Sequence, residues 1–221
     1  MSVTTYTTLR QQLKRFTRRT DIDDVFDTMI ELVENDIYAG KSPLRVMELV
    51  ATATDDCAID DRTMPLPDSY LEMIKVEVKN TSTSTEIVEM AALSVDTMPS
   101  NVQSGKPYRF CVRDGKLVFD AIPDTNYWID FTYFKRLPKL TEAAPTNALL
   151  TNYPRLYFYG LQAVIYDYAG EIEMAREKSM LFQADIAGAN HKYKTGSFGP
   201  SLKMAGSSFA GGAKCNQFCG F

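Results

Sequence analysis

The sequence predicts an α+β fold in which helices at both ends of the chain enclose an antiparallel β region, followed by an extended C-terminal tail. Three patterns indicate this fold. Apolar residues recur at helical spacing over 21–38, alternate with polar residues on both sides of Asp114-Gly115, and fill most positions of 154–169. With 221 residues, 45% of them hydrophobic, the chain can form one sizeable core or two small ones.

Composition narrows the range of functions. His191 is the only histidine, which argues against Ser-His-Asp relays and multi-histidine metal sites. A net charge of -4 argues against nonspecific binding to duplex DNA, because such binding needs many Lys and Arg side chains. No apolar run approaches the roughly 20 residues of a membrane span, and residues 1–8 lack the apolar centre of a secretory signal. We expect a protein made in the cytoplasm, with no membrane partner.

The first two predicted helices carry opposite charges. Residues 5–18 form a short basic helix, and residues 21–38 form an acidic amphipathic helix that Asp21 caps and Gly40 ends. The apolar face of the first helix comprises Tyr6, Leu9, Leu13 and Phe16. The basic helix either contacts phosphates or pairs with the acidic helix of its own or a neighbouring subunit. We favour pairing, which at about 0 to 1 kcal/mol per exposed ion pair sets orientation more than affinity.

Residues 44–137 form the predicted β region. Alternating apolar residues mark three strands: Ile74, Val76 and Val78; Tyr108, Phe110 and Val112; and Tyr127, Ile129, Phe131 and Tyr133. Asp114-Gly115 predicts a hairpin, because a type I′ turn needs positive φ at both central residues. The polar stretch 80–85 predicts an exposed loop. We expect an antiparallel sheet or a small sandwich.

Helices return in the last third of the chain. Thr146 or Asn147 caps a short helical turn, and Pro154 suits the first position of the next helix. Residues 154–169 are apolar nearly all round, so we expect that helix to be covered on most sides, and one chain need not cover it alone. Its aromatic residues therefore belong to the core or to a subunit interface. Residues 171–193 form a last helix, whose apolar seam comprises Ile172, Ala175, Ser179, Phe182, Ile186, Ala189 and Tyr193.

The segment after the last helix is rich in Gly, Ser and Ala but carries isolated large apolar residues: Phe198, Leu202, Met204, Phe209, Phe218 and Phe221. Such a segment cannot bury enough surface to fold alone, so we expect it to order on a partner. Cys215 and Cys219, at a C-x3-C spacing with His191 upstream, match a zinc site poorly. We interpret these two and the remaining Cys57 and Cys111 as reduced thiols.

The chain shows no strong motif for catalysis or cofactor binding. It lacks a P-loop, a dinucleotide-binding glycine motif, a nucleophile elbow and an H-E-x-x-H motif. Two carboxylate clusters occur, at residues 21–24 and 55–61, and we interpret them as a helix cap and a solvated loop. We therefore expect no catalytic, cofactor-binding or metal-binding residues, and no cofactor.

Several short motifs lie between residues 116 and 168. They are Pro123 at the end of a strand, the strand end Tyr133-Phe134-Lys135, the linker Leu137-Pro138-Lys139-Leu140, the turn Thr146-Asn147-Ala148-Leu149-Leu150 and a helix opening at Pro154 and running through Gly160. In this order they resemble the phage head-to-tail adaptor (connector) family of short-tailed bacteriophages. The start of the chain also fits, because an acidic second helix leads into Pro65-Leu66-Pro67. The resemblance covers residues 1–194.

The resemblance implies a structural virion protein. It implies a homo-oligomeric ring, usually of twelve subunits, that binds the portal protein, continues the DNA channel and docks the tail nozzle or tail fibre proteins. Genomic DNA passes through without specific binding, which suits the acidic balance of the chain. In this arrangement residues 1–43 and 141–194 form a helical ring body, 44–140 form a β domain facing the tail, and 195–221 form a portal-binding tail.

Two sets of residues are candidates for contacts in such a ring. A ring subunit needs apolar surface that it cannot cover itself, and the two C-terminal helices supply it. Expected at the subunit interface are Tyr157, Tyr159, Tyr166, Ile172, Phe182 and Ile186. Expected at the portal interface are the tail residues Phe198, Leu202, Met204, Phe209, Phe218 and Phe221. Accordingly, Phe182→Asp is expected to block ring formation more than folding.

Two alternatives to the adaptor stay open. A virion enzyme could hydrolyse peptidoglycan with a carboxylate pair such as Glu72 and Asp130, because glycoside hydrolysis needs two carboxyl groups across a cleft. A capsid or tail-sheath accessory protein could assemble without a portal. We favour the structural adaptor, which performs no covalent chemistry.

Overall fold

The computed structural model describes residues 3–100 and 102–197, with side chains to Thr195. The fold of these residues is α+β, as predicted. The helices are α1 (Tyr6–Thr17), α2 (Phe26–Ala39), α3 (Ala148–Asn152), α4 (Pro154–Tyr168) and α5 (Ile172–Ser197). The strands are β1 (Val50–Asp56), β2 (Thr63–Pro65), β3 (Tyr70–Lys79), β4 (Ile87–Glu89), β5 (Ala91–Ala92), β6 (Arg109–Arg113), β7 (Lys116–Phe119) and β8 (Trp128–Lys135).

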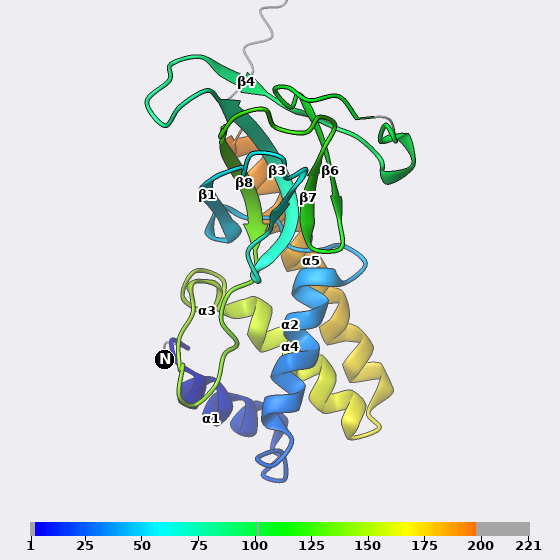
Figure 1. The fold of residues 1–221 in the computed structure, drawn as a ribbon. Coiled ribbons are helices and arrows are strands. Elements are labelled where there is room, and N and C mark those ends of the chain that lie inside the picture. The colour runs from blue at the N-terminus through cyan, green and yellow to red at the C-terminus, as the bar shows by residue number, and fades with distance from the viewer. Residues whose placement is uncertain (1–2, 101, 198–221) are drawn as a thin grey trace, which may run out of the picture.

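The helices gather at one end of the molecule and the strands at the other (Figure 1). We call these ends the helical body and the β part. Each has its own hydrophobic core: Leu13, Phe26 and Leu161 lie in the first, and Val78 and Leu117 lie in the second. Helix α5 begins in the helical body and continues beside the β part (Figure 1). Its buried residues Phe182, Ile186 and Ala189 belong to the core of the helical body.

Local sequence explains the start and the buried face of α1. The Thr5 hydroxyl accepts a hydrogen bond from the Thr8 backbone N–H at 3.2 Å, and the Thr8 hydroxyl accepts one from the Thr5 N–H at 3.0 Å. The predicted core residues Tyr6, Leu9 and Leu13 are buried. Phe16 is not buried, contrary to the prediction. It is 62% exposed, because Thr17, four residues after Leu13, takes the next core position.

Helix α2 begins later than predicted. It starts at Phe26 rather than near residue 21, and no side chain caps its first turn. The predicted cap, Asp21, instead accepts two hydrogen bonds from the Arg19 guanidinium at 3.0 and 2.6 Å. Gly40 ends the helix as predicted, at a position where a Cβ atom would collide with the carbonyl oxygen of Asp36.

Two four-stranded sheets form the β part. Their strand orders are β1-β8-β3-β4 and β2-β7-β6-β5, and the pairs are antiparallel except for the short β5–β6 pair. The inner faces of both sheets contribute to the second core, which confirms the predicted antiparallel region. Asp114 and Gly115 form the predicted turn between β6 and β7, with φ angles of 52° and 71°.

The predicted alternation holds best in β8 and the residue before it. Tyr127, Ile129, Phe131 and Tyr133 are all buried, as expected. In β3, Ile74 is 42% exposed rather than buried, because the pairing with β8 shifts register between Met73 and Lys75. Tyr108 lies just before β6 and is exposed, whereas Cys111 within that strand is buried.

Helix α4 lies at the centre of the helical body. Asn147 caps the preceding α3, accepting a hydrogen bond from the Leu150 N–H at 2.7 Å, and Pro154 occupies the first turn of α4. The side chains that point from α4 into the core are Leu156, Tyr157, Leu161 and Ile165. One chain therefore covers most of this helix. Helix α5 continues to Ser197, so the predicted boundary between helix and tail at residues 194–195 falls inside a helix.

A group of contacts on α5 holds the two parts together, and we call it the Asn190 clamp. The Asn190 side chain donates a hydrogen bond to the Pro43 carbonyl at 2.9 Å and accepts one from the Arg45 N–H at 2.6 Å. One turn further along α5, Tyr193 packs edge-on against Phe134 of β8, with ring centroids 5.9 Å apart. The clamp thus joins α5 to the segment that enters β1 and to the strand that leaves the β part.

Candidate assembly surfaces

The predicted subunit-interface residues divide into buried and exposed positions. Tyr157 and Ile186 are fully buried, and Phe182 and Tyr166 are almost so. Their own subunit covers these four side chains, so they make core contacts rather than forming the free surface that the sequence predicted. Tyr159 is half-buried and Ile172 is 63% exposed. Phe182→Asp is therefore expected to disrupt folding, because it would place an unpaired carboxylate in the helical core.

The predicted portal-interface residues all lie outside the described residues. These are Phe198, Leu202, Met204, Phe209, Phe218 and Phe221, and the same holds for Cys215 and Cys219. His191, the third member of the weak zinc pattern, is exposed on α5. Within residues 3–100 and 102–197, no three His, Cys, Asp or Glu side chains are grouped to hold a metal ion. Cys57 and Cys111 are buried free thiols, and burial raises the pKa of Cys57.

A buried polar network ties α4 to α2 and to the linker after β8. Glu34 Oε1 accepts hydrogen bonds from the Leu140 N–H at 3.1 Å and from the Tyr157 hydroxyl at 3.0 Å. The Tyr157 oxygen in turn accepts a hydrogen bond from Asn147 Nδ2 at 2.8 Å. Burial raises the pKa of Glu34, although both hydrogen bonds that it accepts favour the charged form. Burial also raises the pKa of Tyr157, which therefore stays neutral as a donor.

The basic helix α1 pairs with acidic residues of its own subunit. Asp23, in the turn before α2, binds the Lys14 ammonium group and lies 3.8 Å from Arg10 Nε. The Tyr6 hydroxyl donates a hydrogen bond to Asp27 at 2.6 Å. Burial and this hydrogen bond raise the pKa of Tyr6 to about 12. These contacts support the pairing interpretation of the basic helix within one subunit.

An apolar groove lies between α1 and the N-terminal half of α4, and we call it the aromatic groove. It encloses about 460 Å³ and is lined by Val3, Gln12, Phe16, Pro154, Arg155, Phe158 and Tyr159. Phe16 and Phe158 meet edge to face, with ring centroids 5.1 Å apart. The Arg155 guanidinium lies over the Tyr159 ring at 5.4 Å and pairs with Asp185 at 3.3 Å. Its side chain is still 66% exposed, so a positive charge borders the groove.

A second hollow, which we call the acidic face, lies where α2, the C-terminal half of α4 and the start of α5 meet. It is lined by Asp36, Ala163, Val164, Asp167, Ile172, Ala175, Arg176 and Ser179. Asp36 and Asp167 are exposed, and neither has an ion-pair partner in the part of the chain that the structure describes. Arg176 pairs with Glu173 at 3.6 Å. The face therefore combines an exposed Ile172 with two carboxylates that form no ion pair within the described residues.

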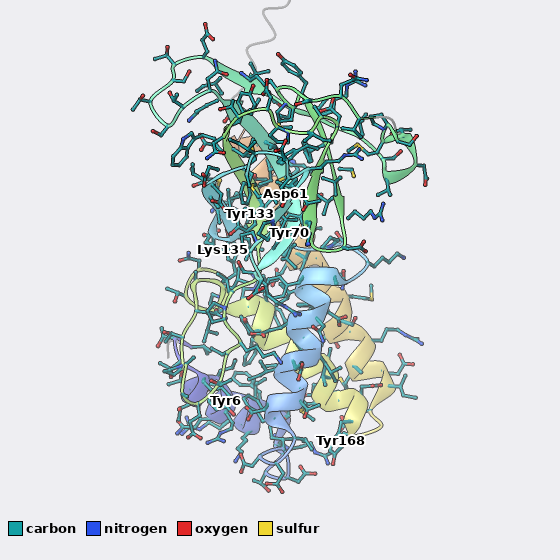
Figure 2. All side chains as sticks on the ribbon, viewed as in Figure 1. Tyr6, Asp61, Tyr70, Tyr133, Lys135 and Tyr168 are labelled. Atoms are coloured by element: carbon teal, nitrogen blue, oxygen red, sulfur yellow. The ribbon has the colours of Figure 1, made fainter. Side chains whose placement is uncertain are left out.

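Asp167 and Ile172 of the acidic face belong to the end of α4 and the start of α5, which lie at the end of the helical body furthest from the β part (Figure 1). Figure 2 shows Tyr168, the last residue of α4, at that end. The Arg19 guanidinium lies over the Tyr168 ring at 5.9 Å. Tyr70 and Tyr133, also labelled in Figure 2, belong to the β part and contact each other with ring centroids 5.9 Å apart. The two candidate surfaces therefore belong to the helical body alone.

The two carboxylates considered for an enzyme do not form a pair. Asp130 binds Lys79 and accepts a hydrogen bond from the Thr54 hydroxyl at 2.7 Å, while Glu72 binds Arg45 at 2.6 Å. In the register of β3 and β8, Glu72 lies opposite position 134, four residues along β8 from Asp130. At 3.3 Å per residue this separation is about 13 Å, beyond the roughly 5 to 9.5 Å of glycosidase carboxyl pairs. The geometry gives the hydrolase alternative no support.

Two of the residues that shape these surfaces escaped the sequence-based prediction. Phe16 is predicted to be buried but is exposed. Positions 16 and 17 both continue the helical spacing from Leu13, and this ambiguity was the only sign in the sequence that Thr17 could take the core position. Phe158 lies one residue after Tyr157, so it falls off the buried stripe that Tyr157, Leu161 and Ile165 form at steps of four. An all-apolar helix hides this distinction, because every position looks equally suited to the core.

None of the described helices has the length and apolarity that a membrane span requires.

One protein-family model matches most of the chain. The model is described as SU10 adaptor protein, and it matches residues 4–201. The matched range begins just before α1 and extends past the end of α5, so it includes the helical body and the β part. A search of curated proteins finds no match.

Proposed function

Because the chain belongs to the SU10 adaptor protein family, a family of phage head-to-tail adaptors, we propose that it forms a ring joining the portal to the tail and continuing the DNA channel. The match over residues 4–201 carries the proposal, because one family pattern covers both cores and the whole of α5. The proposed ring has twelve copies and sits at the head-to-tail junction of the virion. The subunit is made in the host cytoplasm.

We place the docking surface for the tail nozzle or tail fibre proteins on the β part. Several large apolar side chains of this part are about half exposed: Ile59, Ile87, Val95 and Tyr108. They lie in the loop after β1, in the short 3-10 helix Val95–Thr97, on the edge strand β4 and just before β6, and none of them belongs to the helical core. An exposed strand edge also offers unpaired backbone groups to a partner. These features suit contact with another protein.

We assign portal binding to residues 198–221. The 24 residues from 198 to 221 follow Ser197, at the end of α5 that lies beside the β part. Fully extended, they span up to about 80 Å, whereas the 26 residues of α5 span about 39 Å. The segment is therefore long enough to extend past the helical body and reach a portal that lies at the end of the subunit opposite the β part. This arrangement leaves the β part facing the tail.

The charge of the subunit suits a channel through which DNA slides. The chain carries 28 acidic and 24 basic residues, and several of the basic ones, such as Lys14, Arg19 and Lys79, are paired within the subunit. A wall that does not neutralise phosphates releases few counterions and holds DNA weakly. The genome can therefore leave the head without being retained at the junction.

Phage assembly with altered subunits tests this function. Infection with a phage lacking this chain should yield DNA-filled heads without tails, and supplying the intact chain should restore tailed particles. A chain ending at Ser197 should fold but fail to join heads. A full-length control in which the six large apolar residues of 198–221 are replaced by Ser should fail in the same way.

Electron microscopy and protein content of the purified heads provide the readout. Heads that gain tails without this chain would overturn the adaptor function. Heads that bind the Ser-substituted chain would overturn the assignment of portal binding to the apolar residues of 198–221. Averaged images of heads carrying the intact ring should show the β part on the side away from the capsid, and the opposite polarity would overturn the proposed orientation.

A further inference from the structure

The helical body carries two unlike surfaces, and a closed ring requires two. Each subunit in a cyclic ring contacts one neighbour through one patch and the other neighbour through a different patch. The aromatic groove is concave and apolar and bears Arg155 on its rim. The acidic face presents Ile172, with Asp36 and Asp167 around it. The groove thus carries a positive charge and the acidic face carries negative charges, so the two surfaces can attract each other.

The two surfaces also point in different directions. Phe158 in the groove and Val164 on the acidic face are six residues apart on α4. At 3.6 residues per turn, their side chains point about 120° apart around the helix axis and are displaced by about 9 Å along it. A single patch used twice would produce a two-fold dimer, whereas two patches on different sides of one helix suit a head-to-tail contact that repeats around an axis.

We propose that the aromatic groove of one subunit receives the acidic face of the next copy of the same chain. This inference rests on the proposed ring. Ile172, 63% exposed, enters the space between α1 and α4 and covers the Phe16 and Phe158 rings. Arg155 of the groove then faces the Asp36 and Asp167 carboxylates of the neighbour. Each subunit uses its groove once and its acidic face once, which is the head-to-tail arrangement that forms a ring when the rotation between neighbours closes.

Charge argues for a second copy as the occupant. Asp36 and Asp167 have no cationic partner in the described residues of their own subunit, although Arg176 and its partner Glu173 lie nearby. Arg155 pairs with Asp185 yet keeps most of its side chain in solvent, so it can bind a second carboxylate. Arginine and aromatic side chains are also the residues that contribute most at protein interfaces. The groove supplies both kinds, and the acidic face supplies their counterparts.

Cysteine cross-linking in assembled heads tests the contact. Gln12 lies on the groove and Ser179 on the acidic face, so Gln12→Cys and Ser179→Cys place one thiol on each surface. The background carries Cys215→Ser and Cys219→Ser, while the buried Cys57 and Cys111 are retained. Heads carrying the double-cysteine chain are treated with a short bis-maleimide. The expected result is a ladder of covalent oligomers extending to the full ring.

The single-cysteine chains are the matched controls. Each alone should give no cross-linked species, and heads assembled from an equal mixture of the two single variants should give dimers but no longer products. Rings that are visible by electron microscopy but give no ladder overturn the groove-to-face contact and leave the adaptor function intact. Dimers from either single-cysteine chain alone indicate a two-fold contact and also overturn the inference. Heads without rings from the wild-type chain overturn the proposed function itself.

Discussion

Glu34 shows how one buried side chain connects the linker after β8 to the helical body. Its Oε1 atom alone accepts both hydrogen bonds, from the Leu140 backbone and from the Tyr157 hydroxyl. Burial raises the pKa of the carboxyl group above its usual 4.5. Protonation of Glu34 is therefore easier in the folded chain than in the unfolded chain. Its stabilising contribution is fully present below pH 4.5 and is lost as the pH rises through the folded-state pKa.

Glu34→Gln should remove this pH dependence without removing the hydrogen bonds. The amide oxygen of Gln can accept from the same two donors, and the side chain carries no charge to bury. We expect the free energy of unfolding at pH 8 to equal or exceed that of the wild type. We also expect the difference between the two proteins to shrink as the pH falls toward 4.5. Urea unfolding from pH 4.5 to 8.5 measures both quantities.

Glu34→Leu provides the control for the hydrogen bonds. Leu keeps a similar volume but leaves the Leu140 N–H and the Tyr157 hydroxyl without an acceptor, which costs roughly 1 to 3 kcal/mol at every pH. A Gln variant that retains the wild-type pH dependence would contradict the assignment of the raised pKa to Glu34.

Among single residues, the sequence predicts burial better than it predicts partners. Tyr157 was recognised as core or interface, but its bond to Glu34 joins positions 123 residues apart, which local spacing cannot indicate. Ile74 fits the alternation of β3, and only the register shift opposite β8 exposes it. Such shifts depend on how two strands pair, so they are set by tertiary structure.

The packing of α4 against its neighbours depends on a glycine. A Cβ atom at Gly160 would lie 2.7 Å from Val33 Cγ1 of α2 and 3.2 Å from the Phe182 ring of α5. Three helices therefore approach one another where α4 has no side chain. Gly188, in α5, differs, because a Cβ there would meet no atom within 4 Å. The two glycines allow packing and helix propensity to be separated.

Gly160→Ala and Gly188→Ala should change stability in opposite directions. Alanine favours a helix over glycine by about 1 kcal/mol at both positions. At position 160 overpacking should outweigh this gain and lower the free energy of unfolding by about 1 to 3 kcal/mol. At position 188 the gain should remain, at roughly 0.5 to 1 kcal/mol. Urea unfolding compares the two variants, and a stabilised Gly160→Ala protein would show that α4 can move away from α2 at little cost.

At the scale of elements, most of the fold follows from local rules. The Asp114-Gly115 turn, the Asn147 cap and the end of α2 at Gly40 were all predicted, because each depends on backbone preferences of one or two residues. The predicted start of α2 is wrong, because Asp21 accepts hydrogen bonds from Arg19 instead of capping the helix. Helix α5 ran past its predicted end at residue 193, because the segment that follows it carries no Pro before position 200 to stop it.

The described residues form two hydrophobic cores that have no buried residue in common. The helical core includes Leu161, and the core of the β part includes Leu117, both fully buried. The parts are connected by two chain crossings and by the Asn190 clamp. Such separate clusters favour partial opening of one part while the other stays folded.

Leu117→Ala and Leu161→Ala should each loosen only their own part. Each removes a fully buried side chain, at a cost of about 2 to 5 kcal/mol. Hydrogen exchange should accelerate in β6, β7 and β8 for the first variant and in α2 and α4 for the second. Equal acceleration throughout the molecule would show that the two cores unfold as one unit.

The division into helical and β segments was predictable, but the candidate surfaces were not. Composition and motif order indicated a structural adaptor, and the family match supports that class. The aromatic groove joins residues 3–16 to residues 154–159, and no pattern within either segment indicates that they meet. The predicted interface residues were chosen for apolarity, and in a helical bundle the most apolar positions are the ones that the subunit itself covers.

The Asn190 clamp lies near the C-terminal end of α5. Asn190 lies seven residues before the last residue of α5, so traction on that end reaches the clamp before it reaches the helical body. There the load passes through hydrogen bonds to residues 43 and 45, next to the root of β1. A pull on the last turn of α5 would therefore strain these hydrogen bonds and the contact between Tyr193 and Phe134 before it strains the helical core.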